Sequence, residues 1–243
     1  KELATAYEKL QDSFEHLRRA DRLSALGELS AGLAHEIKNP LASMKGSLEI
    51  LASDFSPGHA KREFLEILEK EVDRLNEVLT GFLQFARTPR PDRQPCNLRE
   101  VIDSIRSLCS REAGRHGVRI EVSYQNEPPE LHADAGQLQQ ALLNIVLNGI
   151  QAMPSGGRLS IHVSRRNGTA EIRIHDDGPG VAPQERSRIF DPFFTSKDGG
   201  TGLGLPIAHK LIEGHRGQIR LLEGEGPGST FVVSLPIEGF PHD

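Results

Sequence analysis

Residues 134–176 read DAGQLQQALLNIVLNGIQAMPSGGRLSIHVSRRNGTAEIRIHD, and they carry the clearest helix and strand signals of the C-terminal part of the chain. Asp134 can cap a long apolar helix, and the Pro- and Gly-containing residues 154–157 then supply a turn. Asn167-Gly168 is a two-residue hairpin signal between two alternating segments. The elements expected here are a helix at 134–153 and strands at 158–166 and 169–176.

The segments on either side continue this mixture of helices and strands. Asn97 followed by Glu100 resembles a capping box and opens a helix, and residues 118–124 alternate as a strand does. A further helix is expected at 203–215, with strands at 218–222 and 229–235. Hairpins and helices in this order predict an α/β sandwich, with helices layered on one face of a mostly antiparallel sheet.

The N-terminal third is entirely helical in its pattern. Apolar residues alternate spacings of four and three, as in a coiled coil, and they do so again in a second helix at 59–86 after a turn at 56–58. Two such helices cannot bury their apolar faces alone, so a homodimer that forms a four-helix bundle is expected. Three prolines between Arg87 and Pro95 then predict a linker.

Composition excludes several classes of protein. The formal net charge is −5, with Lys and Arg spread along the chain, so no nucleic-acid partner is expected. The two cysteines suit a reducing compartment. No apolar run is long enough to span a membrane, so we expect a cytoplasmic fragment without membrane contact. The chain begins at Lys1 inside a helical pattern, so a longer protein, cytoplasmic or anchored in an inner membrane, is expected.

His35-Glu36-Ile37-Lys38-Asn39-Pro40 lies within the first helix. Leucines at other positions supply the buried seam, so His35 is free to face outward. Pro40 removes a backbone hydrogen bond at a cost of about 3 kcal/mol, which suggests local bending. A neutral imidazole can attack phosphorus. Asn39 shares the face of His35 at i+4, whereas Glu36 must reach sideways.

Three further segments carry polar or glycine-rich patterns that are weak individually. Asn144 and Asn148 lie four apart in an apolar helix, where an unpartnered amide costs a few kcal/mol, and an amide oxygen suits Mg²⁺. Asp176-Asp177-Gly178-Pro179-Gly180 ends a strand. Residues 199–205 read GGTGLGL and enter a helix, which lets backbone N–H groups approach phosphates, although the ending of a P-loop is missing.

Together and in this order, the four segments resemble the H, N, G1 and G2 boxes of two-component sensor histidine kinases, and residues 189–194 (IFDPFF) resemble the F box. The resemblance implies a dimerisation and histidine-phosphotransfer domain followed by an ATP-binding domain of the Bergerat type. The expected divisions are a coiled-coil signalling helix at 1–30, the phosphotransfer domain at 31–87, a linker at 88–97 and the ATP-binding domain at 98–243.

The resemblance also implies roles for individual residues. His35 would accept the phosphoryl group, with Glu36 assisting proton removal and Asn39 positioning water for dephosphorylation of the partner. Asn148 would hold Mg²⁺, and Asp176 would accept a hydrogen bond from the adenine of ATP. The other residues implied at the nucleotide are Asn144, Gly178, Gly180, Lys197, Gly200, Thr201, Gly202, Leu203, Gly204 and Thr230.

Two departures from the family pattern remove expected cations. Many members have Lys where this chain has Gln151 and Arg where it has Thr195. Lys197, within Thr195-Ser196-Lys197, is the candidate to neutralise the terminal phosphate. The implied partner is the receiver domain of a response regulator, which would take the phosphoryl group on an Asp.

Two alternatives stay open at this point. An ATPase of the gyrase, Hsp90 and MutL type would share the Asn, Asp and Gly segments but has no use for residues 35–40. A dimeric scaffold that only docks a partner would have a degraded nucleotide site, whereas Asn148, Asp176 and the glycines are intact.

Overall fold

The computed structural model describes residues 37–55, 59–86, 89–125, 127, 129–166, 168–197, 200–222 and 227–237. The chain divides into two compact units: residues 1–88 with 191–203, and residues 89–190 with 204–243. The predicted coiled coil at 1–30 lies outside the described residues, as do His35 and Glu36.

The first unit contains a helical hairpin. Residues 37–53 are helical, with Pro40 inside them, and α2 spans Ala60–Ala86. Across the hairpin, Lys45 Nζ donates to Asp73 Oδ1 at 2.6 Å. Arg62 Nη1 donates to the carbonyl oxygens of Ala52 and Phe55 at 3.0 and 2.8 Å, which satisfies acceptors that a helix end leaves open.

Apolar side chains on this hairpin remain on its surface. Ile50 and Phe64 are 70% and 67% exposed, and the set also includes Ile37, Met44, Leu51, Ile67, Leu68 and Leu75. So much exposed apolar surface is unusual for a monomer and marks a contact surface. Within the described residues, no helix has both the length and the apolar content needed to cross a membrane.

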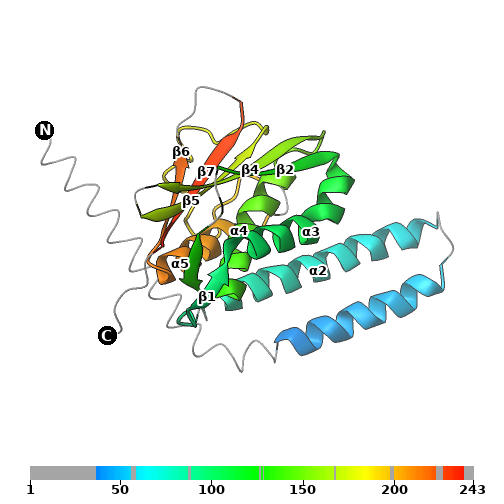
Figure 1. The fold of residues 1–243 in the computed structure, drawn as a ribbon. Coiled ribbons are helices and arrows are strands. Elements are labelled where there is room, and N and C mark those ends of the chain that lie inside the picture. Colours follow the sequence, from blue (N-terminus) through cyan, green and yellow to red (C-terminus); the bar gives the residue numbers. More distant parts are fainter. Residues whose placement is uncertain are drawn as a thin grey trace, which may run out of the picture. The chain divides into compact units, whose positions relative to one another are not determined.

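The second unit is built on a five-stranded sheet with the order β2-β4-β5-β7-β6 (Figure 1). Only the β2–β4 pairing is parallel; the others are antiparallel, as the hairpin signals predict. A separate antiparallel pair joins β1 and β3. The strands are β1 Gln94–Asn97, β2 Val118–Tyr124, β3 Glu130–Ala133, β4 Gly157–Arg166, β5 Thr169–Asp176, β6 Gln218–Leu222 and β7 Ser229–Pro236.

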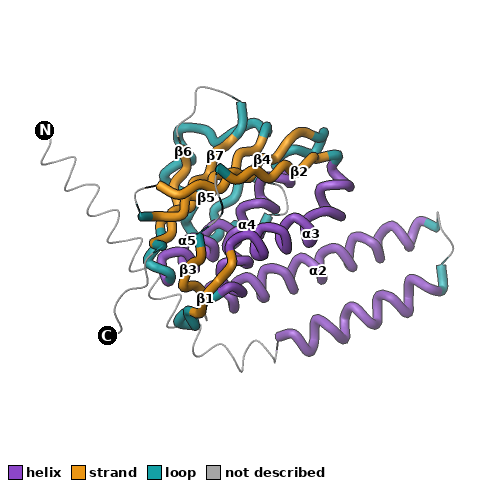
Figure 2. The backbone as a smooth tube through the Cα atoms, viewed as in Figure 1, coloured by secondary structure: helices purple, strands orange, loops and turns teal. Residues whose placement is uncertain are grey.

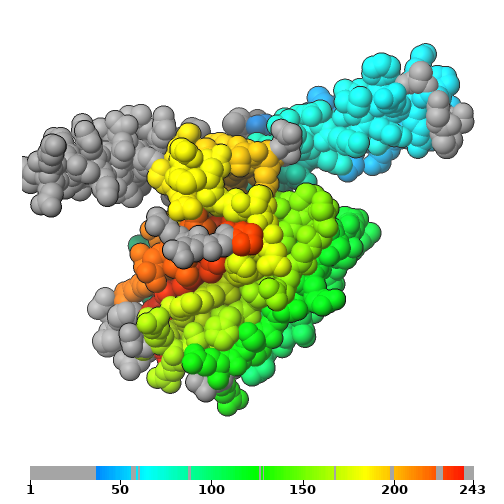
Figure 3. Space-filling model, turned by 90° about the horizontal axis from the view of Figure 1, so that it is seen from above, coloured from blue at the N-terminus to red at the C-terminus, as the bar shows by residue number. Residues whose placement is uncertain are grey.

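Three helices, α3 (Leu98–His116), α4 (Ala135–Gln151) and α5 (Gly204–Gly214), pack on one face of this sheet (Figure 2). Their apolar stripes meet the inward-facing residues of the strands, where Leu142, Ile172 and Phe231 are at most 2% exposed. Figure 3 shows the molecule from above the view of Figure 1, that is, from the face of the sheet opposite α3, α4 and α5. The two-layer α/β arrangement predicted from the sequence is therefore confirmed.

Caps position the helices much as their sequences indicate. Asn97 caps α3, its Oδ1 accepting from Arg99 N at 3.0 Å and its Nδ2 donating to Glu100 at 3.1 Å. Asp134 caps α4 by accepting from Gln137 N at 3.0 Å. Both side chains accept the otherwise unpaired N–H groups of a first helical turn.

The pair of β1 and β3 differs from the sequence-based expectation. The last four residues of the predicted linker at 88–97 form β1, and β3 was not predicted at all. Each strand has only four residues, too few for a clear alternation of polar and apolar side chains. Their pairing buries Cys96 and Leu131.

Both cysteines are buried, and we expect neither to react in the folded protein. Burial raises the pKa of the Cys109 thiol to about 11 and also raises the pKa of Cys96. At pH 8 only about one Cys109 in a thousand would be a thiolate, the reactive form. A chromogenic disulfide reagent should therefore detect no thiol at pH 8 until guanidinium unfolds the chain, and then two. One equivalent reacting within seconds in native buffer would contradict this.

Candidate active site

The two asparagines of α4 lie one turn apart and are both half-buried. Asn144 Nδ2 donates to the carbonyl oxygen of Gly204 at 3.1 Å, which ties α4 to the first residue of α5. Asn144 thus has an internal partner for its amide, as burial in an apolar helix requires. Asn148 shares the same side of α4 because residues four apart are neighbours on a helix.

Asp176 is the last residue of β5 and is only 3% exposed. Its Oδ1 accepts from Gly178 N at 3.0 Å, which turns the chain immediately after the strand. Gly149 of α4 lies against its side chain: a Cβ at Gly149 would be 3.6 Å from Asp176 Oδ2 and 2.8 Å from Leu159 Cδ1. Gly149 directly follows Asn148, so the fold brings Asp176 to the part of α4 that carries this amide.

Glycines let the chain after Asp176 pack closely against neighbouring residues. A Cβ at Gly178 would meet Ala152 Cβ and O at 3.2 Å. Gly180 has a φ of 79° and its Cβ would meet the carbonyl oxygen of Gly228 at 3.0 Å. Both positions therefore need glycine for close approach, and Gly180 needs it for its left-handed backbone as well.

Thr230 does not join this group. In the register of β5 and β7, Asp176 pairs with Ser229 and His175 pairs with Thr230. The Thr230 hydroxyl lies 2.9 Å from His175 Nδ1, on the helix-free face of the sheet. Neighbouring residues of a strand point to opposite faces, so the buried Ser229 shares the face of Asp176. The sequence-based assignment missed Ser229, which only the strand register reveals.

The segment from Phe193 to Leu203 belongs to the first unit, and the structure describes its residues 193–197 and 200–203. Phe193 N donates to Gly202 O at 3.0 Å, and a Cβ at Gly202 would lie 2.7 Å from Phe194 O. Thr195 Oγ1 accepts from Lys197 N at 3.1 Å, and Gly200 N donates to Lys197 O at 3.2 Å.

Thr201 and Leu203 complete this segment. Thr201 Oγ1 accepts from Leu203 N at 3.4 Å, and Leu203 is 1% exposed. Leu203 Cδ1 would lie 3.1 Å from a Cβ at Gly81 of α2. In this arrangement Leu203 serves as a packing residue, whereas the family resemblance implies a place at the nucleotide.

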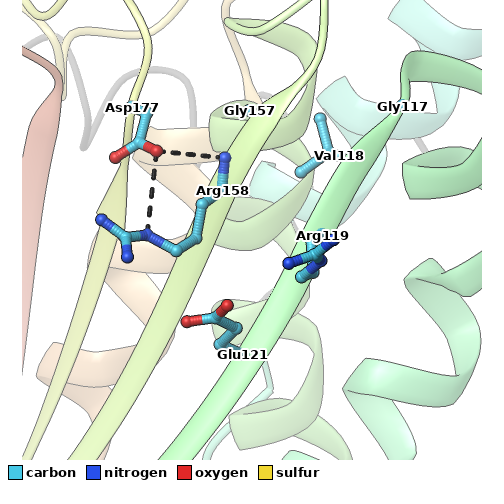
Figure 4. Close-up of a pocket in the computed structure, with 7 residues that line it drawn as sticks. All are labelled: Gly117, Val118, Arg119, Glu121, Gly157, Arg158 and Asp177. Atoms are coloured by element: carbon cyan, nitrogen blue, oxygen red, sulfur yellow. Dashed lines mark hydrogen bonds and ion pairs between the residues drawn. The ribbon is translucent and has the colours of Figure 1, made fainter.

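A cleft of about 590 Å³ lies elsewhere in the second unit (Figure 4). Asp177 is the only residue of the Asp176–Gly180 segment that lines it, and its Oδ2 accepts from Arg158 N at 3.2 Å. The other lining residues are Gly117, Val118, Arg119, Glu121, Gly157 and Arg158. Although they are adjacent in sequence, Asp177 lines this cleft whereas Asp176 lies against Gly149 of α4.

The residues present fit a magnesium ion held mainly by a nucleotide. Among the described residues no group of three or more His, Cys, Asp or Glu side chains could hold a metal. Mg²⁺ commonly keeps its waters and substrate phosphates and takes few protein ligands. The single amide oxygen of Asn148 matches that mode of binding.

Two known protein families match separate parts of this chain. The family described as "Histidine kinase-, DNA gyrase B-, and HSP90-like ATPase" matches residues 133–239, which contain α4, Asp176 and α5. The "His Kinase A (phospho-acceptor) domain" matches residues 25–91, which contain His35 and the helical hairpin. A phospho-acceptor domain followed by an ATPase domain of this class is the arrangement of a histidine kinase.

Individual relatives agree with that class. Sensor histidine kinase ZraS of Escherichia coli K12 is 36% identical over 92% of this chain, and the match spans 48% of ZraS. The chain thus spans about half the length of this curated relative. A structure of the mycobacterial sensor histidine kinase MprB is 33% identical with a TM-score of 0.54, covering 59% of this chain and 97% of that one. The chain belongs to the sensor histidine kinases.

Two other solved structures cover more of this chain than the MprB structure does. Full-length ShkA in complex with AMPPNP has a TM-score of 0.72 and 28% identity, covering 86% of this chain and 45% of that one. Histidine kinase ThkA in complex with the response regulator protein TrrA has a TM-score of 0.68 and 26% identity, covering 95% of this chain and 67% of that one.

Proposed function

We propose that this chain uses Mg·ATP to phosphorylate its own His35 and passes the phosphoryl group to an Asp in the receiver domain of a response regulator. The observation that carries the proposal is the buried Asp176 carboxylate, placed against Gly149 of α4 and followed by Gly178 and Gly180, two positions too crowded for a side chain. The ShkA neighbour was solved with AMPPNP, which supports ATP as the nucleotide.

The adenine would be recognised by Asp176. A buried carboxylate accepts a hydrogen bond from the adenine amino group, and a charged acceptor makes this bond stronger than a neutral one. Oδ1 already accepts from Gly178 N, which holds the carboxylate in one orientation. Gly178 and Gly180 would let the base approach the backbone, and Ser229 would line the same face of the sheet.

The phosphates would lie toward the two asparagines and the glycine-rich segment. Asn148 would hold Mg²⁺, which neutralises charge on the phosphates, and Asn144 would keep Gly204 in place through its hydrogen bond. Lys197 would neutralise the terminal phosphate, since phosphoryl transfer depends on charge stabilisation and positioning. Gly200, Thr201, Gly202 and Leu203 would shape the end of the glycine-rich segment.

In the proposed transfer, one ring nitrogen of His35 bonds to the γ-phosphorus while the bond to the β–γ bridging oxygen breaks and ADP leaves. Glu36 would accept the proton from the other ring nitrogen. A carboxylate oxygen of the receiver Asp would then attack the phosphorus and break the N–P bond. Asn39, exposed on its helix, would position the water that later hydrolyses the phosphorylated receiver.

A homodimer and a receiver domain are the proposed partners. The exposed apolar side chains of the hairpin, such as Ile50, Phe64 and Leu68, would be buried between two copies in a four-helix bundle. The ThkA neighbour was solved with a response regulator, which supports a partner of this kind.

The wild-type chain incubated with Mg²⁺ and γ-labelled ATP should acquire label that acid removes and base does not, as expected of a phosphoramidate. Mass spectrometry should place the label on His35, and EDTA should prevent labelling. Hydrolysis of ATP with no label on the chain would contradict the proposal and favour an ATPase of the gyrase class. Neither labelling nor hydrolysis would favour a scaffold.

A further inference from the structure

The C-terminal end of the nucleotide-site helix α5 is fastened by His215, which is only 4% exposed. Its Nε2 accepts from Asp134 N at 3.0 Å, and its Nδ1 lies 2.8 Å from Leu211 O. An amide donor at Nε2 and a carbonyl acceptor at Nδ1 require a neutral ring with its proton on Nδ1. The bonds therefore connect the last turn of α5 with the N-cap of α4.

The chain before β1 meets the same place. Arg93 Nη2 donates to Gly214 O, the last residue of α5, at 2.7 Å. Asp92 N donates to Asp134 Oδ2 at 3.2 Å, and Gln137 Nε2 donates to Pro89 O at 3.1 Å. Residues 89–93 are thus hydrogen-bonded to the first turn of α4 and, through Arg93, to the end of α5.

The opposite end of α5 begins at Gly204, whose carbonyl oxygen accepts from Asn144. At 1.5 Å per residue α5 is about 16 Å long, so a tilt of about 10° at its C-terminal end would move Gly204 by about 3 Å. A displacement of that size exceeds what the 3.1 Å hydrogen bond to Asn144 tolerates.

We propose that His215 and Arg93 are positioning residues for nucleotide binding: they hold the C-terminal end of α5 so that its N-terminal end stays fixed to Asn144. Neither residue touches the nucleotide in this proposal. The inference rests on the proposed nucleotide site, because these two residues would act by keeping Gly204 in its position beside Asn144.

The test compares variants that remove or keep these bonds. His215→Leu removes both bonds of the ring, His215→Gln retains an acceptor on a side chain of similar reach, and Arg93→Met removes the bond to Gly214. The matched control is His116→Leu, since His116 is a half-buried residue of α3 whose ring lies 3.2 Å from Glu112 Oε1 and, among the described residues, has no other hydrogen-bond partner. Calorimetry with AMPPNP and Mg²⁺ gives Kd. Each titration is run at a temperature well below the unfolding midpoint of the variant.

We expect Kd to rise about tenfold or more for His215→Leu and about three- to tenfold for Arg93→Met, with partial recovery in His215→Gln. Hydrogen exchange of the amides after Gly204 should accelerate in the folded variants, while β4 and β5 stay protected. A lower unfolding midpoint with Kd within about twofold of wild type would overturn the inference. If His215→Leu does not fold, Arg93→Met decides by the same criterion. Wild-type protein that fails to bind AMPPNP would instead overturn the proposed function.

Discussion

Replacing His35 with Gln is expected to abolish incorporation of label from γ-labelled ATP. Gln has a similar size and keeps hydrogen-bonding groups, but its amide nitrogen is not nucleophilic, so no phosphoramidate can form. Binding of AMPPNP should stay within about twofold of wild type, because in the proposed reaction His35 attacks only after the nucleotide is bound. The measurement is autoradiography of the chain after incubation with Mg²⁺, together with calorimetry.

His59→Gln is the matched control for this experiment. His59 is an exposed residue before α2 in the same helical hairpin, and its Nδ1 accepts from Lys61 N at 3.2 Å. Labelling of this variant should equal that of the wild-type chain. Acid-labile label that persists in His35→Gln would show that another residue accepts the phosphoryl group.

Replacing Asp176 with Asn is expected to raise Kd for AMPPNP about 10- to 100-fold. A hydrogen bond to a charged acceptor contributes about 1.5–3 kcal/mol, and each 1.4 kcal/mol changes affinity about tenfold. Asn can still accept from Gly178 N through its carbonyl oxygen, so the turn after β5 is retained. Its NH₂ group would instead confront the adenine amino group, donor against donor.

The neighbouring Asp177→Asn is the control, because the Asp177 carboxylate faces Arg158 and the cleft of Figure 4 rather than Gly149. Its Kd for AMPPNP should stay within about threefold of wild type. Thermal unfolding shows whether both variants are folded at the temperature of the titration. Equal loss of affinity in the two variants would contradict recognition through Asp176.

Local signals account for most of the secondary structure. Asn97 and Asp134 predict the starts of α3 and α4, and Asn167-Gly168 predicts the hairpin of β4 and β5, because caps and tight turns depend on residues adjacent in sequence. The short strands β1 and β3 were missed. A four-residue strand carries little pattern of its own, and its pairing depends on a segment more than thirty residues away.

The candidate site divides in the same way. The residue types of the site can be read from local sequence: the asparagine pair of α4, the Asp-Gly segment at the end of β5 and the glycine-rich segment before α5. Only the tertiary structure placed Ser229 rather than Thr230 on the face of Asp176, since a register shift of one residue exchanges the two faces of a strand. It also joined His215 to Asp134 across 81 residues. Such contacts arise from packing of distant segments, which no local spacing encodes.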